Sequence, residues 1–426
     1  MTTVHQLVRS DPPDPIRPES TMAMVETSGD SGAPMAAVLR LGAVFGFLSV
    51  GMGLAPALAT AWSAVFALDG GSVANIHNLK DLGLIAAMVA GPVVLRRYGP
   101  ERAMRGAVVT ALAGCAAAFA CRSYVGVLAA VFLHGAAFSL GSSAAVLALF
   151  RLPPEFRRLA ALTATFGLAG ILAPAAVGML MRTPDAYSLV YAGYAVPLGA
   201  LYIWLCAVRR SVGGGQSETA AGRVDHGSGG MGRVAVVRVI RIWAPELVVY
   251  ALILGGETVV VSWVTAIGQW RYGYTLAHAT ALLSLLWAVH TAARACGDVL
   301  ARSLPVPRLL VIGCVVAVLG IVGLCSGEGV LVHGGVVVFA VGIAPLNPLH
   351  QGWVLARASD DERAVLNSGL GVMAAAATTA LVWLTGLAVD RDNRLPFVVA
   401  VILLAMVGSW AAVRGTGNVS PEPRRG

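Results

Sequence analysis

The feature that most constrains this chain is a succession of long apolar stretches separated by short polar turns. Only 12% of the residues are charged, against roughly a quarter in soluble proteins. Each stretch is long enough to form a helix that crosses a bilayer, which takes about 20 residues. The sequence therefore predicts an all-α membrane protein with twelve transmembrane helices, near residues 37–62, 73–96, 104–121, 124–150, 159–181, 186–208, 243–268, 276–301, 308–326, 330–356, 364–389 and 395–413.

The runs divide into two groups of six around a polar stretch. Residues 209–241 are rich in Gly, Ser and Arg, a composition typical of a flexible linker. We therefore expect two pseudo-symmetric six-helix bundles, at residues 36–208 and 242–414. Residues 1–35, with their Pro and Gly content, are expected to be a disordered cytosolic tail, and residues 415–426 a second cytosolic tail.

The arginines indicate the orientation of the chain in the membrane. They are concentrated in every second turn between the apolar runs, in the central linker and in the tail after the last run. Positively charged residues are enriched in cytoplasmic loops, so both termini and the linker are expected in the cytosol. The protein itself is expected in the inner (cytoplasmic) membrane. The opposite turns hold only Arg122, Arg182, Arg271, Arg391 and Arg394.

A basic loop motif occurs once in each half of the chain. Residues 91–102 read Gly-Pro-Val-Val-Leu-Arg-Arg-Tyr-Gly-Pro-Glu-Arg, and residues 297–308 read Gly-Asp-Val-Leu-Ala-Arg-Ser-Leu-Pro-Val-Pro-Arg. This repetition indicates that the two halves arose by duplication. Three positions correspond at one constant offset: Gly91 with Gly297, Arg96 with Arg302, and Arg102 with Arg308.

Six plus six helices, a central linker and a basic loop after the second and eighth helices resemble the major facilitator superfamily. The family's loop motif is Gly, three residues, Asp, Arg, any residue, Gly and then basic residues. The acidic residue, which helps to lock the cytosolic gate in the family, is absent here, since Leu95 and Ala301 stand at its two positions. The resemblance implies a cytosolic gate, with a plain orientation signal as the alternative, at Gly91, Arg96, Arg97, Gly99, Arg102, Gly297, Asp298 and Arg302.

The fifth apolar run carries part of a second motif of the family. The antiporters of the superfamily have Gly-x-x-x-Gly-Pro-x-x-Gly-Gly in helix 5, and this chain keeps Pro174 and Gly178. The resemblance implies an antiporter. The alternative is close helix packing, because small residues are common wherever membrane helices approach each other.

Ionisable residues meet at mid-membrane depth in the seventh and eighth runs. Glu257 lies about 14 residues into the seventh helix, and His290 lies at a similar depth in the eighth, which runs the opposite way. Arg294 follows one turn later on the same face as His290. Since charges in hydrocarbon usually face a cavity or a partner, these residues are candidates for proton coupling or substrate binding. The alternative is a structural ion pair between the two helices.

The second run is apolar only from Leu82 to Leu95, too short to cross a bilayer alone. Its preceding polar residues are thus expected in the outer half of the membrane. They are predicted to form an outer gate or entry cluster, or else a wet interfacial end at which the lysine extends to water: His77, Lys80 and Asp81.

Three further polar residues are candidates for the lining of a cavity. His134 lies near mid-depth in the fourth run, where a hydrogen-bonded core histidine is the alternative. Asn347 and Gln351 lie in the tenth run beside Pro345 and Pro348, and helices interrupted by proline often line cavities. Simple bending of the helix is the alternative there.

These features favour a secondary active transporter for a small organic solute, with proton-coupled export as the leading hypothesis and an uptake symporter or facilitator as the alternative. The expected partners are lipid, the solute and protons. We expect no enzyme activity, cofactor or metal, since no HExxH, GxSxG or Walker sequence occurs. The net charge of +8 resides in short loops, so nucleic-acid binding is not expected. A transport-inactive scaffold and a polytopic membrane enzyme are the alternatives of other classes.

Overall fold

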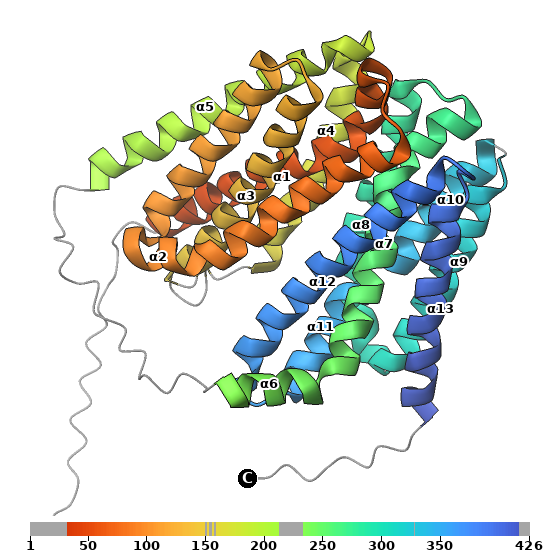
Figure 1. Ribbon diagram of the computed structural model, residues 1–426. Helices are drawn as coiled ribbons and strands as arrows, with labels where there is room; N and C mark the ends of the chain where they lie inside the picture. Colours follow the sequence, from red (N-terminus) through yellow and green to blue (C-terminus); the bar gives the residue numbers. More distant parts are fainter. Residues whose placement is uncertain are drawn as a thin grey trace, which may run out of the picture.

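The computed structural model describes residues 32–149, 151–152, 156, 159–212, 233–327 and 329–416, and within these residues the regular structure is helical (Figure 1). One bundle consists of α1 (Gly32–Phe66), α2 (Gly70–Ala120), α3 (Tyr124–Leu149), α4 (Leu159–Leu180) and α5 (Tyr187–Val212). The other consists of α7 (Ala244–Tyr272), α8 (Leu276–Ser303), α9 (Val306–Cys325), α10 (Gly329–Ile343), α11 (Leu346–Arg357), α12 (Asp360–Val389) and α13 (Leu395–Thr416).

Helix α2 contains the second and third predicted spans, folded back on each other at Gly99. A straight helix of 51 residues would be about 76 Å long at 1.5 Å per residue. Yet the hydroxyl of Tyr124, just past its end, donates to the carbonyl of Ser72 near its start, at 2.8 Å. The reversal occurs where Gly99 has φ 73° and ψ 164°, followed by Pro100. Glycine adopts this positive φ without the steric cost of a side chain.

The tenth predicted span is interrupted at its prolines. Helix α10 ends at Ile343 and α11 begins at Leu346, with Pro345 between them. Ten helices in the described part of the chain are long and apolar enough to span a membrane. Helix α2 provides two crossings, and α4 adds the shorter apolar helix Ala164–Leu180. The predicted all-α fold in two bundles is therefore confirmed, with about twelve spans.

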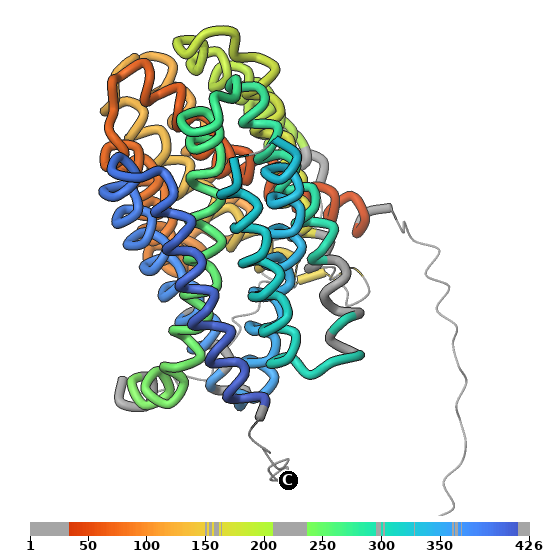
Figure 2. Tube along the Cα trace, turned by 90° about the vertical axis from the view of Figure 1, so that its right-hand side faces the viewer, coloured from red at the N-terminus to blue at the C-terminus, as the bar shows by residue number. Residues whose placement is uncertain are grey.

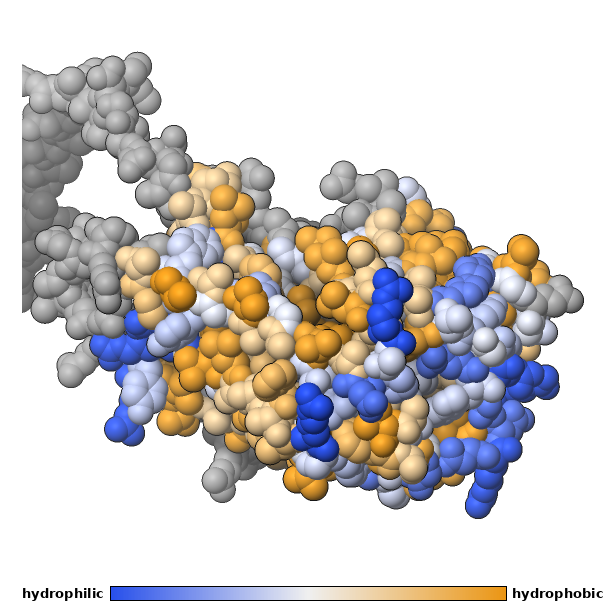
Figure 3. Space-filling model, turned by 90° about the horizontal axis from the view of Figure 1, so that it is seen from above, coloured by the Kyte–Doolittle hydropathy of each residue, from blue (hydrophilic) through white to orange (hydrophobic). Residues whose placement is uncertain are grey.

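The outer surface of the bundles is apolar. Large hydrophobic side chains point outward along most helices, among them Val93, Met179 and Ile203, which are 67%, 75% and 69% exposed. Figure 3 looks onto the upper end of the molecule, where hydrophilic residues lie among apolar ones. Apolar sides with polar ends are the arrangement that a bilayer requires.

The two bundles pack closely at the end where α2 begins and α12 finishes. The backbone N–H of Gly70 donates to both carboxylate oxygens of Asp390, at 2.9 and 3.1 Å. A Cβ added to Gly386 would lie 2.3 Å from the Cβ of Ala74, so only glycine permits this approach. The ribbons converge at this upper end and diverge toward the lower end, where the C-terminus lies (Figure 1).

A short helix, α6 (Arg233–Ile242), lies across the lower end of the C-terminal bundle (Figures 1 and 2). The predicted linker at 209–241 is thus helical at both of its ends, because α5 continues to Val212 and α6 begins at Arg233. Its middle, residues 213–232, lies outside the described residues, as do residues 1–31 and 417–426 of the predicted tails.

Candidate functional site: a polar cavity between the two bundles

A cavity of about 390 Å³ lies between the two bundles. Helices α1 to α4 form one wall, and α7, α8, α11 and α12 form the other. Its polar lining includes four charged side chains, two of each sign, and its apolar lining includes bulky aromatic rings. The residues that matter for its chemistry are Ser49, Lys80, Asp81, Phe138, Phe166, Tyr250, Glu257, Thr258, Ser262, Trp287, Arg294, Asn347 and Thr378.

Glu257 is the buried acid of this cavity. Its Oε1 lies 3.1 Å from Nε2 of His290 and 3.7 Å from Nη2 of Arg294. The side chain is 7% exposed and that of His290 is 1% exposed, whereas Arg294 is 36% exposed. The two basic residues reach one carboxylate because their spacing of four places them on one face of α8. The structure therefore brings together the three residues that the sequence predicts as a cluster.

The break between α10 and α11 positions Arg294. Pro348 has no N–H, so the carbonyl of Ala344 lacks its usual helical partner four residues later. Nε of Arg294 donates to this carbonyl at 3.3 Å. The proline therefore leaves an acceptor that orients the guanidinium, and the same break brings Asn347 to the cavity wall.

Lys80 and Asp81 face the same cavity from α2. Nζ of Lys80 lies 3.4 Å from Oδ1 of Asp81, and both side chains are about 10% exposed. They lie on the cavity wall and not at a wet outer end of the helix. His77 lies apart from them. Its ring is buried, with ring centroids 6.4 Å from Trp263, and neither ring nitrogen has a hydrogen-bond partner among the described residues. The three residues predicted as an outer cluster therefore separate into a cavity pair and a core histidine.

Two other predicted lining residues lie off the cavity. His134 is buried, with Nδ1 2.7 Å from the carbonyl of Ala130 and Nε2 3.6 Å from Sγ of Cys115. The rings of Tyr191 and Tyr194 pack against it, so it is placed as a core histidine. Gln351 donates to Oδ1 of Asn367 at 3.0 Å on the surface.

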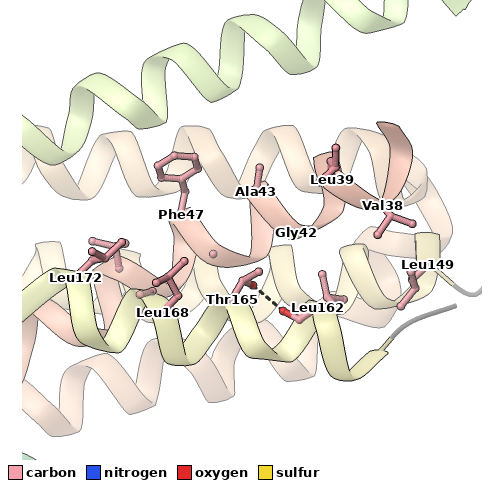
Figure 4. A pocket seen from close by; sticks show the side chains of 13 residues that line it. Val38, Leu39, Gly42, Ala43, Phe47, Leu149, Leu162, Thr165, Leu168 and Leu172 are labelled. Atoms are coloured by element: carbon pink, nitrogen blue, oxygen red, sulfur yellow. Dashed lines mark hydrogen bonds between the residues drawn. The ribbon is translucent and has the colours of Figure 1, made fainter. Parts of the chain in front are cut away.

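A separate groove lies between α1 and α4, outside the central cavity (Figure 4). It measures about 400 Å³ and has an almost wholly apolar lining, including Phe47, Leu168 and Leu172. The hydroxyl of Thr165 is engaged with the carbonyl of Leu162 at 2.6 Å. This groove offers no charged group to a polar solute, so the polar cavity is the better candidate site.

Solved membrane transporters share this architecture. A bacterial homologue of the human lysosomal transporter Spinster, inward-facing and unoccupied, superposes with a TM-score of 0.73 at 13% identity, covering 90% of this chain and 97% of that one. A D-xylose–proton symporter gives 0.68 at 13% identity, covering 88% and 96%. The fucose–proton symporter of E. coli gives 0.59 at 14%, covering 89% and 99%.

The chain has the major facilitator fold. The resemblance predicted from its loop motifs is therefore confirmed at the level of the fold. No family model matches the sequence, and no curated protein sequence matches it.

The loop motif of the major facilitator fold lies at the reversal of α2. Arg96, Arg97 and Arg102 are exposed there, and Gly99 supplies the positive φ of the turn. Beyond its own helix backbone, no atom of the described residues lies within 4 Å of a Cβ added to Gly91, so close packing does not require that glycine. The backbone of Gly297, Asp298 and Arg302 belongs to α8, but their side chains lie outside the described residues. The gating role of both loops stays a prediction.

The antiporter motif of the fifth predicted span, which is α4, lies where the two bundles touch. Pro174 and Gly178 are in α4, and a Cβ on Gly178 would lie 2.4 Å from Oγ1 of Thr280 in α8. A Cβ on Gly170, on the same helix, would lie 2.7 Å from the indole of Trp287. These small residues allow close contact between α4 and α8, which is the packing alternative. That the protein is an antiporter stays a prediction.

The aromatic part of the cavity was not predictable from the sequence. Phe166 and Trp287 line it with ring centroids 5.5 Å apart, one from each bundle. A large ring within an apolar helix carries no signal of its own in the sequence. The one available signal is that Trp287 precedes His290 by three residues, on the same face of α8.

Proposed function

We propose that this protein is a secondary active transporter that moves a small organic solute by alternating access, with Glu257 carrying the coupling proton. The observation that supports this most is the buried Glu257 carboxylate on the wall of a cavity between two bundles, beside His290 and Arg294. An acid that alternately binds a proton and pairs with a neighbouring cation is a common way to couple proton movement to transport.

The cavity favours a solute with an apolar body and either no net charge or charges of both signs. Lys80 and Arg294 supply positive charge, and Asp81 and Glu257 supply an equal negative charge. Phe166 and Trp287 offer apolar and aromatic contact from opposite bundles. A volume of about 390 Å³ fits a small organic molecule.

Export of a drug or metabolite is the direction that we propose, and it rests on Pro174 and Gly178 of the antiporter motif. The alternative is proton-coupled uptake. It is favoured by the neighbours that are proton symporters for D-xylose and fucose. We place the protein in the cytoplasmic membrane with both termini in the cytosol, on the distribution of its arginines.

The test is solute flux in proteoliposomes with and without an imposed pH gradient. Glu257→Gln keeps the size of the side chain but cannot exchange a proton, so flux driven by the gradient is expected to fall to the level of empty vesicles. Glu246→Gln is the matched control, because Glu246 lies on the same helix and is paired with Arg414 at 2.9 Å, away from the cavity lining.

Three outcomes would contradict the proposal in different ways. Wild-type flux that ignores the gradient excludes proton coupling, and equal loss in both variants excludes a special role for Glu257. The absence of flux across a broad panel of neutral and zwitterionic solutes favours a scaffold.

A further inference from the structure

Two histidines meet on the surface of the C-terminal bundle, at the end where α7 turns into α8 (upper right in Figure 1). His278 lies in the first turn of α8 and His333 lies near the start of α10. Their Nε2 atoms are 2.9 Å apart. His278 is exposed and His333 is half-buried, whereas the other histidines of the described residues are buried: His77, His134, His290 and His350.

The surrounding groups fix both rings. Nδ1 of His333 lies 2.6 Å from the carbonyl oxygen of Gly329, which can only accept, so Nδ1 carries the hydrogen. In the neutral ring Nε2 then has a free lone pair. The ring of His278 stacks on that of Tyr274, with centroids 4.1 Å apart and planes 14° apart. The two Nε2 atoms are therefore aimed at one place from two different helices.

We propose that His278 and His333 form a binding site for a divalent transition-metal ion of the zinc and copper class. Neutral imidazole nitrogen is a preferred ligand of these ions. A histidine ligand usually donates its other ring N–H to a carbonyl or carboxylate, as His333 does to Gly329. In a tetrahedral zinc site two such nitrogens lie about 3.4 Å apart, so the rings need to separate by about half an ångström.

Water would complete the coordination of this site. The described residues contain no group of three or more His, Cys, Asp and Glu side chains that could hold a metal. The site is therefore open, unlike a closed structural zinc site. The competing interpretation is a plain hydrogen bond from His278 to His333 that joins α8 to α10. This bond would need no ion.

The experiment measures metal binding by the full-length protein, purified through a tag without histidine. The background variant carries His5→Ala, His226→Ala and Cys121→Ser, which removes the two histidines outside the described residues and the exposed cysteine. Cys206, Cys296 and Cys325 are also replaced by serine in it. It is expected to bind one Zn²⁺ per chain in equilibrium dialysis, and Cu²⁺ bound in its place is expected to show coupling to two imidazole nitrogens by electron paramagnetic resonance. His278→Ala and His333→Ala should each weaken zinc binding by at least the roughly 10–100-fold that loss of an outer-shell partner costs.

Tyr274→Phe is the matched control, because it keeps the stacked ring and removes only the hydroxyl. It is expected to bind zinc as the background does, and zinc is expected to raise the thermal midpoint of both but of neither histidine variant. The proposal is overturned if the background binds no zinc, or if either histidine variant binds as tightly as the background. If the histidine variants unfold at a lower temperature than the background by the same amount with and without zinc, the plain hydrogen bond is supported instead.

Discussion

At the scale of single residues, Arg294 has two partners that belong to different helices. It approaches Oε1 of Glu257 in α7 and donates to the carbonyl of Ala344 before α11. A guanidinium can serve both because its donors form a planar fork, which the single ammonium of lysine does not offer. Arg294 therefore connects the proposed proton site to the break in the tenth span.

Removal of Arg294 is expected to destabilise the C-terminal bundle. Arg294→Ala leaves a buried carboxylate and a carbonyl without this donor, and a lost hydrogen bond of this kind costs about 1–3 kcal/mol. Arg294→Lys keeps the charge and should lose less. The measurement is thermal unfolding in detergent. Arg308→Ala, at an exposed arginine of α9, is the control and should unfold as the wild type does. Equal midpoints for Arg294→Ala and the control would contradict the dual contact.

The sequence predicted the cluster of Glu257, His290 and Arg294 because charged residues are rare and costly in apolar helices. His77 differs from the outer position predicted for it, because it is buried beside Trp263. An apolar run fixes the depth of a residue, but it does not tell which neighbouring helix its side chain will face. Residues of the second helix therefore could not be divided between the cavity and the core before the packing was known.

At the scale of elements, the two glycines of the loop motif have different structural roles. Gly99 has φ 73° at the reversal of α2 and is followed by Pro100. Gly91 lies within the helix, with open space where a Cβ would stand. Membership of the motif therefore does not tell whether a position requires glycine. The backbone conformation at that position decides this.

The two substitutions to alanine are expected to have opposite effects on stability. Gly99→Ala forces a side chain into a conformation with positive φ and extended ψ, which essentially only glycine adopts, at a cost of about 1–3 kcal/mol. Gly91→Ala should stabilise by up to about 1 kcal/mol, because alanine favours a helix over glycine. Thermal midpoints of the two variants, measured side by side in the same detergent, check this. A midpoint for Gly99→Ala at or above that of Gly91→Ala would show that the turn does not depend on glycine.

The breaks in the helices were predictable to different degrees. Pro345 and Pro348 predict the interruption of the tenth span, because a proline within a helix removes one backbone hydrogen-bond donor. The reversal of α2 was predictable only as a polar stretch between two apolar runs. The close approach of α12 to α2 was not predictable, because Gly386 meets Ala74 only after both bundles have formed.

At the scale of the whole molecule, orientation decides which end of the cavity faces the cell. We expect a cysteine at Asp69 to be labelled by an impermeant thiol reagent from outside intact cells. A cysteine at Gly214 should be labelled only after the membrane is opened, because the arginine-rich turns favour the cytosol. The reagent is applied to chains that lack the native cysteines. The reverse pattern would invert the proposed orientation.

The contact between Gly70 and Asp390 is expected to keep the cavity closed at the end where the bundles meet. Two carboxylates lie at the N-terminus of α2, where the helix dipole favours negative charge: Asp69 from its own bundle and Asp390 from the other. The hydroxyl and N–H of Ser72 hold the pKa of Asp69 below its ordinary value. The carboxylate of Asp69 therefore accepts hydrogen bonds from its own helix. Asp390 is then the acid that joins the bundles.

Loss of Asp390 should open this end. In a chain without native cysteines, Thr258→Cys places a thiol on the cavity wall. Asp390→Ala removes a hydrogen bond to a charged group, which commonly contributes about 1.5–3 kcal/mol. A loss of this size corresponds to a rise of about tenfold or more in the labelling of that thiol by a reagent added at the end where Gly70 lies. Asp392→Ala is the matched control, because Asp392 lies in the same turn but accepts from the N–H of Arg394 within its own bundle, at 2.9 Å. If both substitutions leave labelling unchanged, packing of Gly386 against Ala74 keeps the end closed without the carboxylate.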